Sequence, residues 1–399
     1  MSAERHLNNT YQSVAEAYIV EALRTAGGRR GGKLAGWHPA DMAGEVLSAL
    51  VKRSGIDPAA VEDVILGCVS QVGEQSFHIG RNAVLASNLP NSVPAVSIDR
   101  QCGSSQQALH FAAQAVMSGT QDVVIAAGVE SMSRVPMGSP VALAAKAGLG
   151  GPWSDRILRR FGVREFSQFT GAEMIAEKYG FTRAQLDAFA LDSHRRAAAA
   201  RDSGAFTGEI LPLAVADGVH STDEGIRADA TLESIGSVKL LREGGVLTAA
   251  NASQVCDGAS GVLVVNERGL HAHGLTPLAR IHQMTVTGGD PVIMLEEPIP
   301  ATRRALARAG MNLDDVDLYE VNEAFAPIPL AWLQSLDADP AKLNVNGGAI
   351  ALGHPLGASG TKLMATLVHA LRARGKRYGL QTMCEGGGIA NVTIVEALA

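Results

Sequence analysis

Cysteine and aromatic residues are scarce in this sequence. It contains four cysteines among 399 residues, and only 4% of its residues are aromatic. Cys68, Cys102, Cys256 and Cys384 lie far apart and form no C-x-x-C pair, which argues against a disulfide framework and against a zinc site. Scattered unpaired cysteines are typical of proteins from reducing compartments. We therefore expect a cytoplasmic protein.

Long hydrophobic runs and an excess of positive charge are also missing. No apolar run reaches the length needed to span a bilayer, so we expect no membrane partner. The 34 Lys and Arg residues are outnumbered by 40 Asp and Glu residues, for a net charge of −6, and this balance argues against a nucleic-acid partner. His271 and His273 are closely spaced, but the polar stretch around them offers no further ligand, so we predict no metal.

Glycine and small apolar residues are abundant instead. The chain has 44 glycines, and 46% of its residues are hydrophobic, a composition that suits a compact α/β enzyme with glycine-rich loops. A chain of this length can bury a large core and is expected to divide into two or three domains.

Two stretches of the chain repeat each other at a constant offset. The stretch from Leu50 to Pro58, which contains Gly55, is matched by the stretch from Leu306 to Leu313, which contains Gly310 255 residues later. Each copy is followed by a strand-like apolar run. The same offset relates Cys102 to Gly357, and both of these residues precede an apolar helical pattern. A register kept over about 70 residues is too long for a solenoid and predicts two duplicated α/β domains.

The domain boundaries follow from this repeat. The second copy runs directly into its last strand, whereas roughly 130 residues intervene in the first copy, and we interpret them as an inserted loop domain. Residues 1–16 are polar and lack the apolar core of a secretory signal, so we expect a loose N-terminal extension there. The predicted domains are an N-terminal domain over 17–129 plus 256–276, a loop domain over 130–255 and a C-terminal domain over 277–399.

Cys102 lies between a predicted strand and a predicted helix. The stretch 93–98 is a short apolar run, and the apolar pattern over 103–117 is helical. The unpaired N–H groups and the dipole at the start of a helix stabilise a thiolate, so this position predicts an activated nucleophile. The alternative is that Cys102 is a small buried apolar residue, as free cysteines often are.

Three further loops carry reactive side chains after predicted strands, at Asn322, at His354 and at Cys384. Loops that follow strands converge at one edge of an α/β sheet, where such folds bind ligands. A Cys–His pair supplies a nucleophile and its base. A second cysteine beside a triple glycine can move a proton while backbone N–H groups stabilise an oxyanion.

Together these motifs resemble the thiolase family of acetyl-CoA acyltransferases, over essentially the whole chain from residue 17. The motifs that carry the resemblance are Gln101-Cys102-Gly103-Ser104, Val129-Glu130-Ser131-Met132-Ser133, Asn251-Ala252-Ser253, Val321-Asn322-Glu323-Ala324-Phe325, the stretch from Gly347 to Pro355, and Cys384-x-Gly386-Gly387. The resemblance implies the thiolase fold, in which two duplicated α/β domains form a five-layer αβαβα core with an inserted loop domain.

The resemblance also implies roles for individual residues. Cys102 would take the acyl group as a thioester while His354 accepts its proton, and Cys384 would serve as the second acid/base. One oxyanion hole would combine His354 with a water held by Asn322, and the other would use the backbone N–H groups of Cys102 and Gly386. Acyl-CoA and coenzyme A would be the substrates, with no metal or redox cofactor, and the protein would form a homodimer or homotetramer.

The loop domain of thiolases supplies most contacts to coenzyme A. The positions that the resemblance assigns to binding coenzyme A and substrate are Arg227, Ser234, Ala249, Ser253, Ala324, Phe325 and Gln168.

Two positions depart from the family pattern. Short-chain biosynthetic thiolases carry a His-Met pair where this chain has Gln168-Phe169, which suggests a roomier acyl pocket and a degradative 3-ketoacyl-CoA thiolase. Glu385 stands between Cys384 and Gly386, where a small or apolar residue is commoner. A carboxylate close to Cys384 would raise the pKa of that thiol, but we expect Glu385 to point into solvent.

Other functions remain open at this point. The same fold could run in the biosynthetic direction and condense two acetyl-CoA molecules into acetoacetyl-CoA. Decarboxylating condensing enzymes of the same superfamily lack a second catalytic cysteine, so Cys384 argues against them. A non-catalytic coenzyme A-binding scaffold and a cysteine hydrolase built on Cys102 and His354 are the alternatives from other classes.

Overall fold

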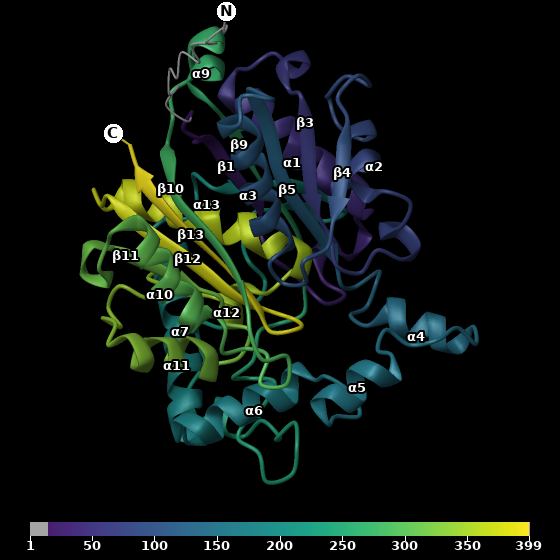
Figure 1. Cartoon of the computed structure of the whole chain (residues 1–399), viewed down its shortest axis with the longest axis vertical. Helices are drawn as coiled ribbons and strands as arrows, with labels where there is room; N and C mark the ends of the chain where they lie inside the picture. Colours follow the sequence, from purple (N-terminus) through teal and green to yellow (C-terminus); the bar gives the residue numbers. More distant parts are fainter. Residues whose placement is uncertain (1–14, 399) are drawn as a thin grey trace, which may run out of the picture.

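A computed structural model describes residues 15–398, so most of the predicted N-terminal extension lies outside the described residues. Figure 1 shows a mixed α/β body with two shorter helices projecting from it. The first half of its sheet has the strand order β1 (Tyr18–Thr25), β9 (Cys256–Val265), β5 (Val123–Ser131), β3 (Asp63–Gly67) and β4 (Ala95–Ile98).

The second half repeats this plan. Its order is β10 (Ala279–Gly288), β13 (Ile389–Ala397), β12 (Tyr378–Glu385) and β11 (Leu318–Val321). The two halves join where β1 and β10 run antiparallel, through the pairs Tyr18–Arg280 and Ile19–Ala279. The pairing pattern is the same in both halves. In the first, β5 runs parallel to β3 and antiparallel to β9, and in the second, β12 runs parallel to β11 and antiparallel to β13.

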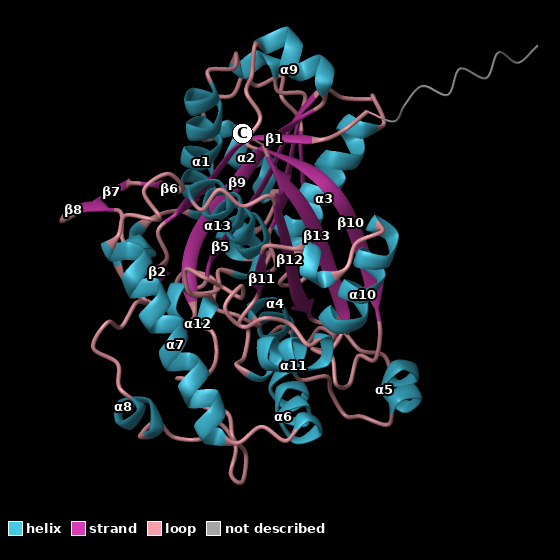
Figure 2. Ribbon diagram, turned by 90° about the vertical axis from the view of Figure 1, so that its left-hand side faces the viewer, coloured by secondary structure: helices cyan, strands magenta, loops and turns pink. Residues whose placement is uncertain are grey.

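The 255-residue offset is visible in the helices as well. Helix α3 begins at Ser104 and ends at Met117, and α13 begins at Ser359 and ends at Ala373. Both lie in the middle of the molecule (Figures 1 and 2). They approach closely because residue 360 is glycine, and a β-carbon there would overlap the backbone of Gln106 in α3. The duplicated fold predicted from the sequence is therefore confirmed.

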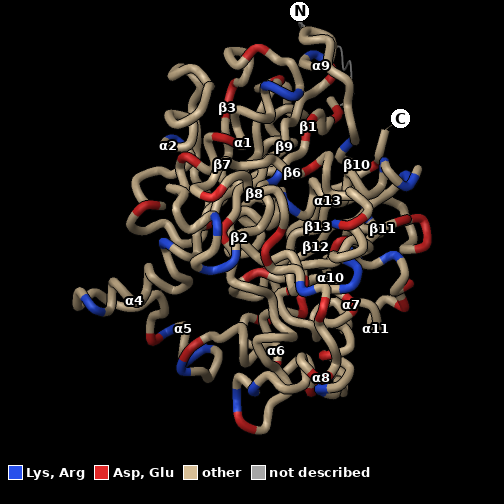
Figure 3. Tube along the Cα trace, turned by 180° about the vertical axis from the view of Figure 1, so that it is seen from behind, with Lys and Arg blue, Asp and Glu red and all other residues tan. Residues whose placement is uncertain are grey.

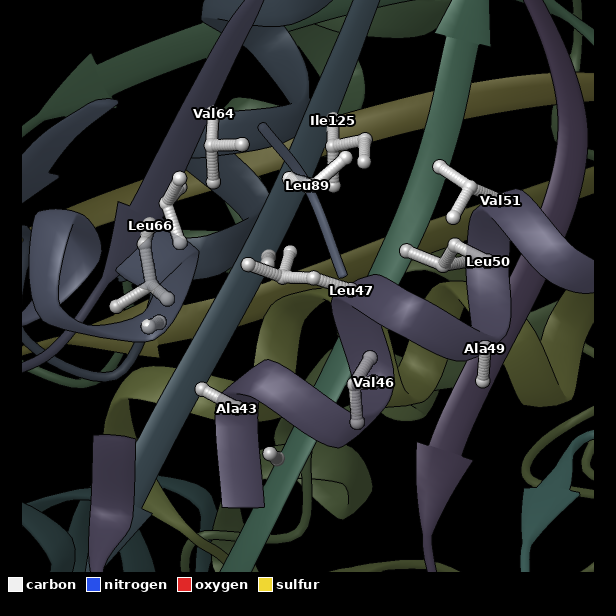
Figure 4. Packing of buried hydrophobic residues seen from close by; sticks show 14 of the residues in the cluster. Ala43, Val46, Leu47, Ala49, Leu50, Val51, Val64, Leu66, Leu89 and Ile125 are labelled. Carbon is white, nitrogen blue, oxygen red and sulfur yellow. The ribbon is translucent and has the colours of Figure 1, made fainter. Parts of the chain in front are cut away.

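Outer helices complete five layers. Helices α1 (Pro39–Ser54) and α2 (Ile79–Leu85) cover the first half of the sheet, and α10 (Pro298–Ala309) covers the second, with α11 (Pro327–Leu336) packed against α10. Figure 4 shows the apolar face of α1, where Val46, Leu47 and Leu50 lie against strand residues such as Ile125. Helix α1 ends at Gly55, whose φ of 74° is the left-handed conformation that glycine accepts without strain.

The chain between β5 and β9 holds the predicted loop domain. Its elements are α4 (Ser139–Lys146), α5 (Asp155–Phe161), α6 (Gln168–Tyr179), α7 (Arg183–Asp202), β6 (Ile210–Leu211), β7 (Leu213–Val215), β8 (Gly218–His220) and α8 (Leu232–Gly236). Helices α4 and α5 project from the body in Figure 1 and contain no buried residue. The domain boundaries given above stay a prediction.

The remaining elements are β2 (Gly28–Arg29), α9 (Glu267–His273) and α12 (Ala349–Leu352), with single 3-10 turns at Lys33–Gly36, Pro58–Ala60, Gly73–Gln75, Leu313–Asp315 and Leu356–Ala358. Acidic and basic residues are interspersed along the chain in Figure 3. Within residues 15–398 no helix is both long and apolar enough to cross a bilayer. The same residues contain no group of three or more His, Cys, Asp or Glu side chains that could hold a metal ion.

Candidate active site

Cys102 lies in a tight turn between β4 and α3. Gln101, immediately before it, has a φ of 48°, a left-handed conformation that costs a non-glycine residue free energy. Three hydrogen bonds hold the turn. The Gln101 N–H donates to Asp99 Oδ1 (2.7 Å), the Ser104 hydroxyl donates to the Gln101 carbonyl (2.6 Å), and the Arg100 N–H donates to Ser104 Oγ (2.9 Å). The turn therefore presents the Cys102 side chain in one fixed direction.

The Cys102 thiol is protonated in the resting protein. Burial, together with the charge of Glu385, raises its pKa to about 12. Backbone hydrogen bonding at the start of α3 lowers the pKa of this thiol, but desolvation and a neighbouring carboxyl raise it by more. The role of Cys102 as an activated nucleophile stays a prediction.

His354 is held in one tautomer by Ser359. The Ser359 hydroxyl donates its only proton to the Pro355 carbonyl (2.8 Å), so it can only accept from His354 Nδ1, which lies within hydrogen-bond distance. With the proton on Nδ1, Nε2 carries the lone pair. Asn322 Nδ2 lies 3.4 Å from Nε2. Burial and the charge of Lys362 lower the pKa of His354 to about 3, so the ring is a neutral base.

Lys362 fixes the loop that carries His354. Its buried ammonium group donates to the carbonyls of Leu352 (2.6 Å) and Gly353 (2.8 Å), immediately before His354. These bonds satisfy two carbonyls at the end of α12 that would otherwise be buried without partners. Neither Ser359 nor Lys362 was expected from the sequence. They stand five and eight residues after His354 at the start of α13, and no spacing rule for catalytic motifs marks them.

Cys384 and Glu385 end strand β12, and both side chains are fully buried. Burial, followed by the charges of Cys102 and Glu385, raises the pKa of Cys384 well above its ordinary value. The two thiols are thus close enough for the charge of one to act on the other. Cys384 is therefore a weak acid that holds its proton at neutral pH.

The prediction that Glu385 points into solvent is wrong. Its carboxyl group lies against Gly103, where a β-carbon would overlap it. Neither of its oxygens has a hydrogen-bond partner among residues 15–398. The side chain turns inward because glycine at position 103 leaves room at the start of α3. A glycine flanking a reactive cysteine was the available signal, but nothing in the sequence said which side chain fills the space.

Cys102 opens into a cavity of about 640 Å³ that is mostly apolar. Gln168, Gly386 and Leu356, two residues from His354, line it together with Cys102. The far wall comes from the projecting part of the loop domain, with the side chains of Met137, Val141, Trp153, Ile157, Phe161 and Phe166. Phe166 packs edge-on against both Trp153 and Phe161, with ring centroids 5.7 Å apart in each pair.

Three of the residues predicted to bind coenzyme A line a second cavity. Arg227, Ser234 and Ala249 surround a space of about 230 Å³. His194 shares this wall and accepts a hydrogen bond from the Arg227 N–H (3.2 Å). Burial and the charge of Arg227 lower the pKa of His194 to about 4, so Arg227 is the cationic side chain of this pair at neutral pH.

The remaining predicted contacts lie deeper. Ala324 and Phe325 are buried in the core of the second half, and the Ser253 N–H donates to the Ala324 carbonyl (2.9 Å). Phe325 packs edge-on against Phe169, with centroids 5.5 Å apart. These three residues connect the loop domain to the Asn322 loop. Their role in binding coenzyme A stays a prediction.

Comparison with known proteins decides the family. Residues 17–268 match the model of the thiolase N-terminal domain, and residues 275–397 match that of the thiolase C-terminal domain. The chain belongs to the thiolase family. Thiolases are acyltransferases, and this thiolase places Cys102, Cys384, His354 and Asn322 in the geometry described above.

Several relatives are similar over almost their whole length. The steroid 3-ketoacyl-CoA thiolase FadA6 of Mycobacterium tuberculosis is 52% identical over 387 residues, covering 96% of this chain and 95% of the relative. The acetyl-CoA acetyltransferase of Escherichia coli is 42% identical over 393 residues, covering 95% and 98%. The crystal structure of human mitochondrial 3-ketoacyl-CoA thiolase in complex with CoA is 37% identical, with a TM-score of 0.86 and coverage of 96% and 98%.

Proposed function

We propose that this thiolase cleaves 3-ketoacyl-CoA by coenzyme A, giving acetyl-CoA and a shortened acyl-CoA. The observation that carries the proposal is the opening of Cys102 into the 640 Å³ apolar cavity. That cavity gives a nucleophile room for a large acyl chain beside it. The similarity to proteins named 3-ketoacyl-CoA thiolase supports the same activity.

In the first half-reaction Cys102 attacks the 3-keto carbon. The thiol proton passes to His354 Nε2, which the Ser359 hydrogen bond leaves free to accept it. The new C–S bond forms as the bond between C2 and C3 breaks, and the electron pair of that bond becomes the acetyl-CoA enolate. Cys384 protonates the enolate at C2. Backbone N–H groups of Cys102 and Gly386 and the His354–Asn322 pair stabilise the oxygens on which negative charge develops.

In the second half-reaction coenzyme A takes the acyl group from Cys102. Its thiol gives a proton to the Cys384 thiolate left by the first step, and its sulfur attacks the thioester carbonyl. The C–S bond to Cys102 breaks, and the departing thiolate regains the proton held by His354. All protons and electrons are thereby accounted for without an oxidant, and no metal or redox cofactor enters the balance. The covalent intermediate divides one carbon–carbon cleavage into two easier transfers.

We propose bulky, ring-bearing acyl groups as the preferred substrates. The far wall of the cavity offers aromatic and branched faces such as Trp153, Ile157 and Phe166, which suit a wide apolar body. A pocket of this size lies in the range that buries a drug-sized ligand. The name of the steroid thiolase relative points in the same direction. The Arg227 cavity is proposed to receive part of coenzyme A, with Arg227 meeting its phosphates.

A panel of 3-ketoacyl-CoA substrates tests this function. Initial rates of thiolysis are measured for acetoacetyl-CoA, for straight-chain substrates of increasing length and for substrates with fused rings. We expect kcat/KM to rise with acyl bulk in the native protein and to disappear in Cys102→Ala. Activity confined to acetoacetyl-CoA would keep the thiolysis reaction but overturn the substrate assignment.

We also propose that the protein is a homodimer, the minimal unit of the homodimer or homotetramer expected above. Strand β4 is the last in its sheet, and Val96 on it is 40% exposed. Phe77, in the loop before α2, is 92% exposed. An exposed edge strand beside large apolar side chains is an aggregation hazard unless another chain covers it. Sedimentation velocity that gives only monomer would contradict this assembly.

A further inference from the structure

Glu385 occupies a position in the site that the reaction described above does not use. Its side chain is fully buried at the end of β12, and its carboxyl group packs against Gly103, the residue after Cys102. Both oxygens are buried without a hydrogen-bond partner among residues 15–398. A buried carboxylate without partners is costly, whereas a neutral carboxylic acid is much less so.

The charged groups near Glu385 and the two thiols come from four elements. Among residues 15–398, Arg100 in the turn before α3 is the cation that acts on Glu385, and the backbone of Asn391 in β13 also lowers its pKa. Glu385 in turn acts on Cys102 in that turn and on Cys384 in β12. Asp99 and Glu130 of β5 act on Cys102 as well. A charge on Glu385 therefore adds to the acidic groups that already act on Cys102.

Burial raises the pKa of Glu385 to about 8, and Arg100 only partly offsets that effect. The carboxyl group is therefore neutral at neutral pH and ionises at mildly alkaline pH. When Glu385 is ionised, its negative charge raises the pKa of Cys102 and of Cys384. The titration of the carboxyl and of the two thiols is coupled, so that the loss of one proton opposes the loss of the next.

We propose that Glu385 acts through Cys102 as a positioning residue whose neutral form is required for thiolate formation, and so sets the upper pH limit of the reaction. The proposal rests on the function assigned to Cys102 above. In the neutral form Glu385 adds no charge beside the nucleophile, and the Cys102 proton passes to His354. In the ionised form two negative charges would share one desolvated site, and the Cys102 proton stays in place.

Alkylation of Cys102 by iodoacetamide tests this without any acyl-CoA. The rate is measured from about pH 6 to pH 9.5 by mass spectrometry of the Cys102 peptide, in the native protein and in Glu385→Gln, which keeps the shape of the neutral acid. We expect equal rates at the acidic end, and Glu385→Gln to be faster by about tenfold at the alkaline end if ionised Glu385 shifts the Cys102 pKa by one unit. The ratio of the Glu385→Gln rate to the native rate should reach half of its full rise at a pH near the pKa of Glu385.

A structural role would give a ratio between variant and native rates that does not change with pH, and this result would overturn the proposal. Glu385→Ala serves as the second variant and should give the same pH-dependent ratio, so the test does not depend on one variant folding well. Glu320→Gln is the matched control, because Glu320 is also a buried carboxyl with an unpartnered oxygen but does not act on Cys102. Its ratio should stay constant with pH.

The experiment separates two kinds of failure. If the protein cleaves no 3-ketoacyl-CoA but the alkylation ratio rises with pH, the proposed function is wrong and the Glu385 assignment stands. If thiolysis proceeds but the alkylation ratio does not change with pH, the proposed function stands and the Glu385 assignment is wrong. Where thiolysis is present, the alkaline fall of kcat/KM should move to higher pH in Glu385→Gln.

Discussion

The carboxyl group of Glu385 fills the space that a β-carbon on residue 103 would occupy. Gly103 has a φ of −86°, which any residue can adopt. Glycine is thus required at this position for room and not for backbone conformation. The nucleophile turn and the end of β12 are therefore coupled through one side chain.

This coupling predicts the outcome of a double-mutant cycle. Gly103→Ala forces the new methyl group into Glu385 and should destabilise the protein by about 1–3 kcal/mol, the usual cost of overpacking. The substitution should cost much less in a Glu385→Ala background, where the space is vacant. Urea unfolding of the four proteins measures the interaction free energy. Additive effects, with no interaction free energy, would contradict the packing described here.

The raised pKa of Glu385 predicts a pH-dependent gain in stability for Glu385→Gln. In the unfolded chain the carboxyl ionises near its ordinary value of 4.5, whereas in the folded protein it holds its proton up to about pH 8. The native protein therefore loses stability as pH rises between these two values. Glu385→Gln should be more stable by on the order of a few kcal/mol above pH 8, with the difference vanishing at acidic pH.

Denaturant unfolding at several pH values measures this difference directly. The control is Glu396→Gln, since Glu396 is paired with Arg280 and Arg377 and has a lowered pKa. That variant should be less stable than the native protein near neutral pH, and its deficit should shrink as the pH falls. A constant difference for Glu385→Gln at all pH values would mean that the carboxyl is already ionised in the folded state.

The Ser359–His354 hydrogen bond predicts a catalytic defect with little change in fold. Ser359→Ala removes the acceptor that keeps the proton on Nδ1, so the ring can turn or carry its proton on Nε2. We expect kcat to fall by about 10–100-fold, as for other partners that orient a functional histidine, with KM nearly unchanged. Ser54→Ala is the control, because the Ser54 hydroxyl donates to the Val51 carbonyl within its own helix. An unaltered kcat in Ser359→Ala would show that the Ser359 hydrogen bond to His354 does not contribute to catalysis.

Much of the fold could be predicted from the sequence because duplication leaves a signature that survives divergence. The offset between Gly55 and Gly310 implied two similar domains, and the starts of α3 and α13 keep it. Apolar periodicity placed the Cys102 helix to within one residue, since it begins at Ser104 where the pattern indicated Gly103. The strand before it is shorter than expected, Ala95–Ile98, because the preceding residues form a turn.

The site was less predictable because its electrostatics depend on distant packing. The pKa of Cys102 is raised first by burial and further by Glu385 when that carboxyl is ionised, and Glu385 is 283 residues away in sequence. The tautomer of His354 depends on a serine whose own proton is committed to Pro355. Side-chain direction was decisive for Glu385, and a strand pattern alone does not reveal which space is empty. Local sequence motifs identified the candidate reacting residues, whereas the pKa values of these residues depend on how the folded core packs around them.

We propose above all that Cys102 carries the acyl group between the two half-reactions. Mass spectrometry of the intact protein after brief incubation with a ring-bearing 3-ketoacyl-CoA, without free coenzyme A, tests it most directly. We predict one added acyl group of the shortened chain, mapped to the Cys102 peptide, absent in Cys102→Ala and released as acyl-CoA when coenzyme A is added. Acylation that persists at another residue in Cys102→Ala, or turnover without any acylated protein, would contradict the account.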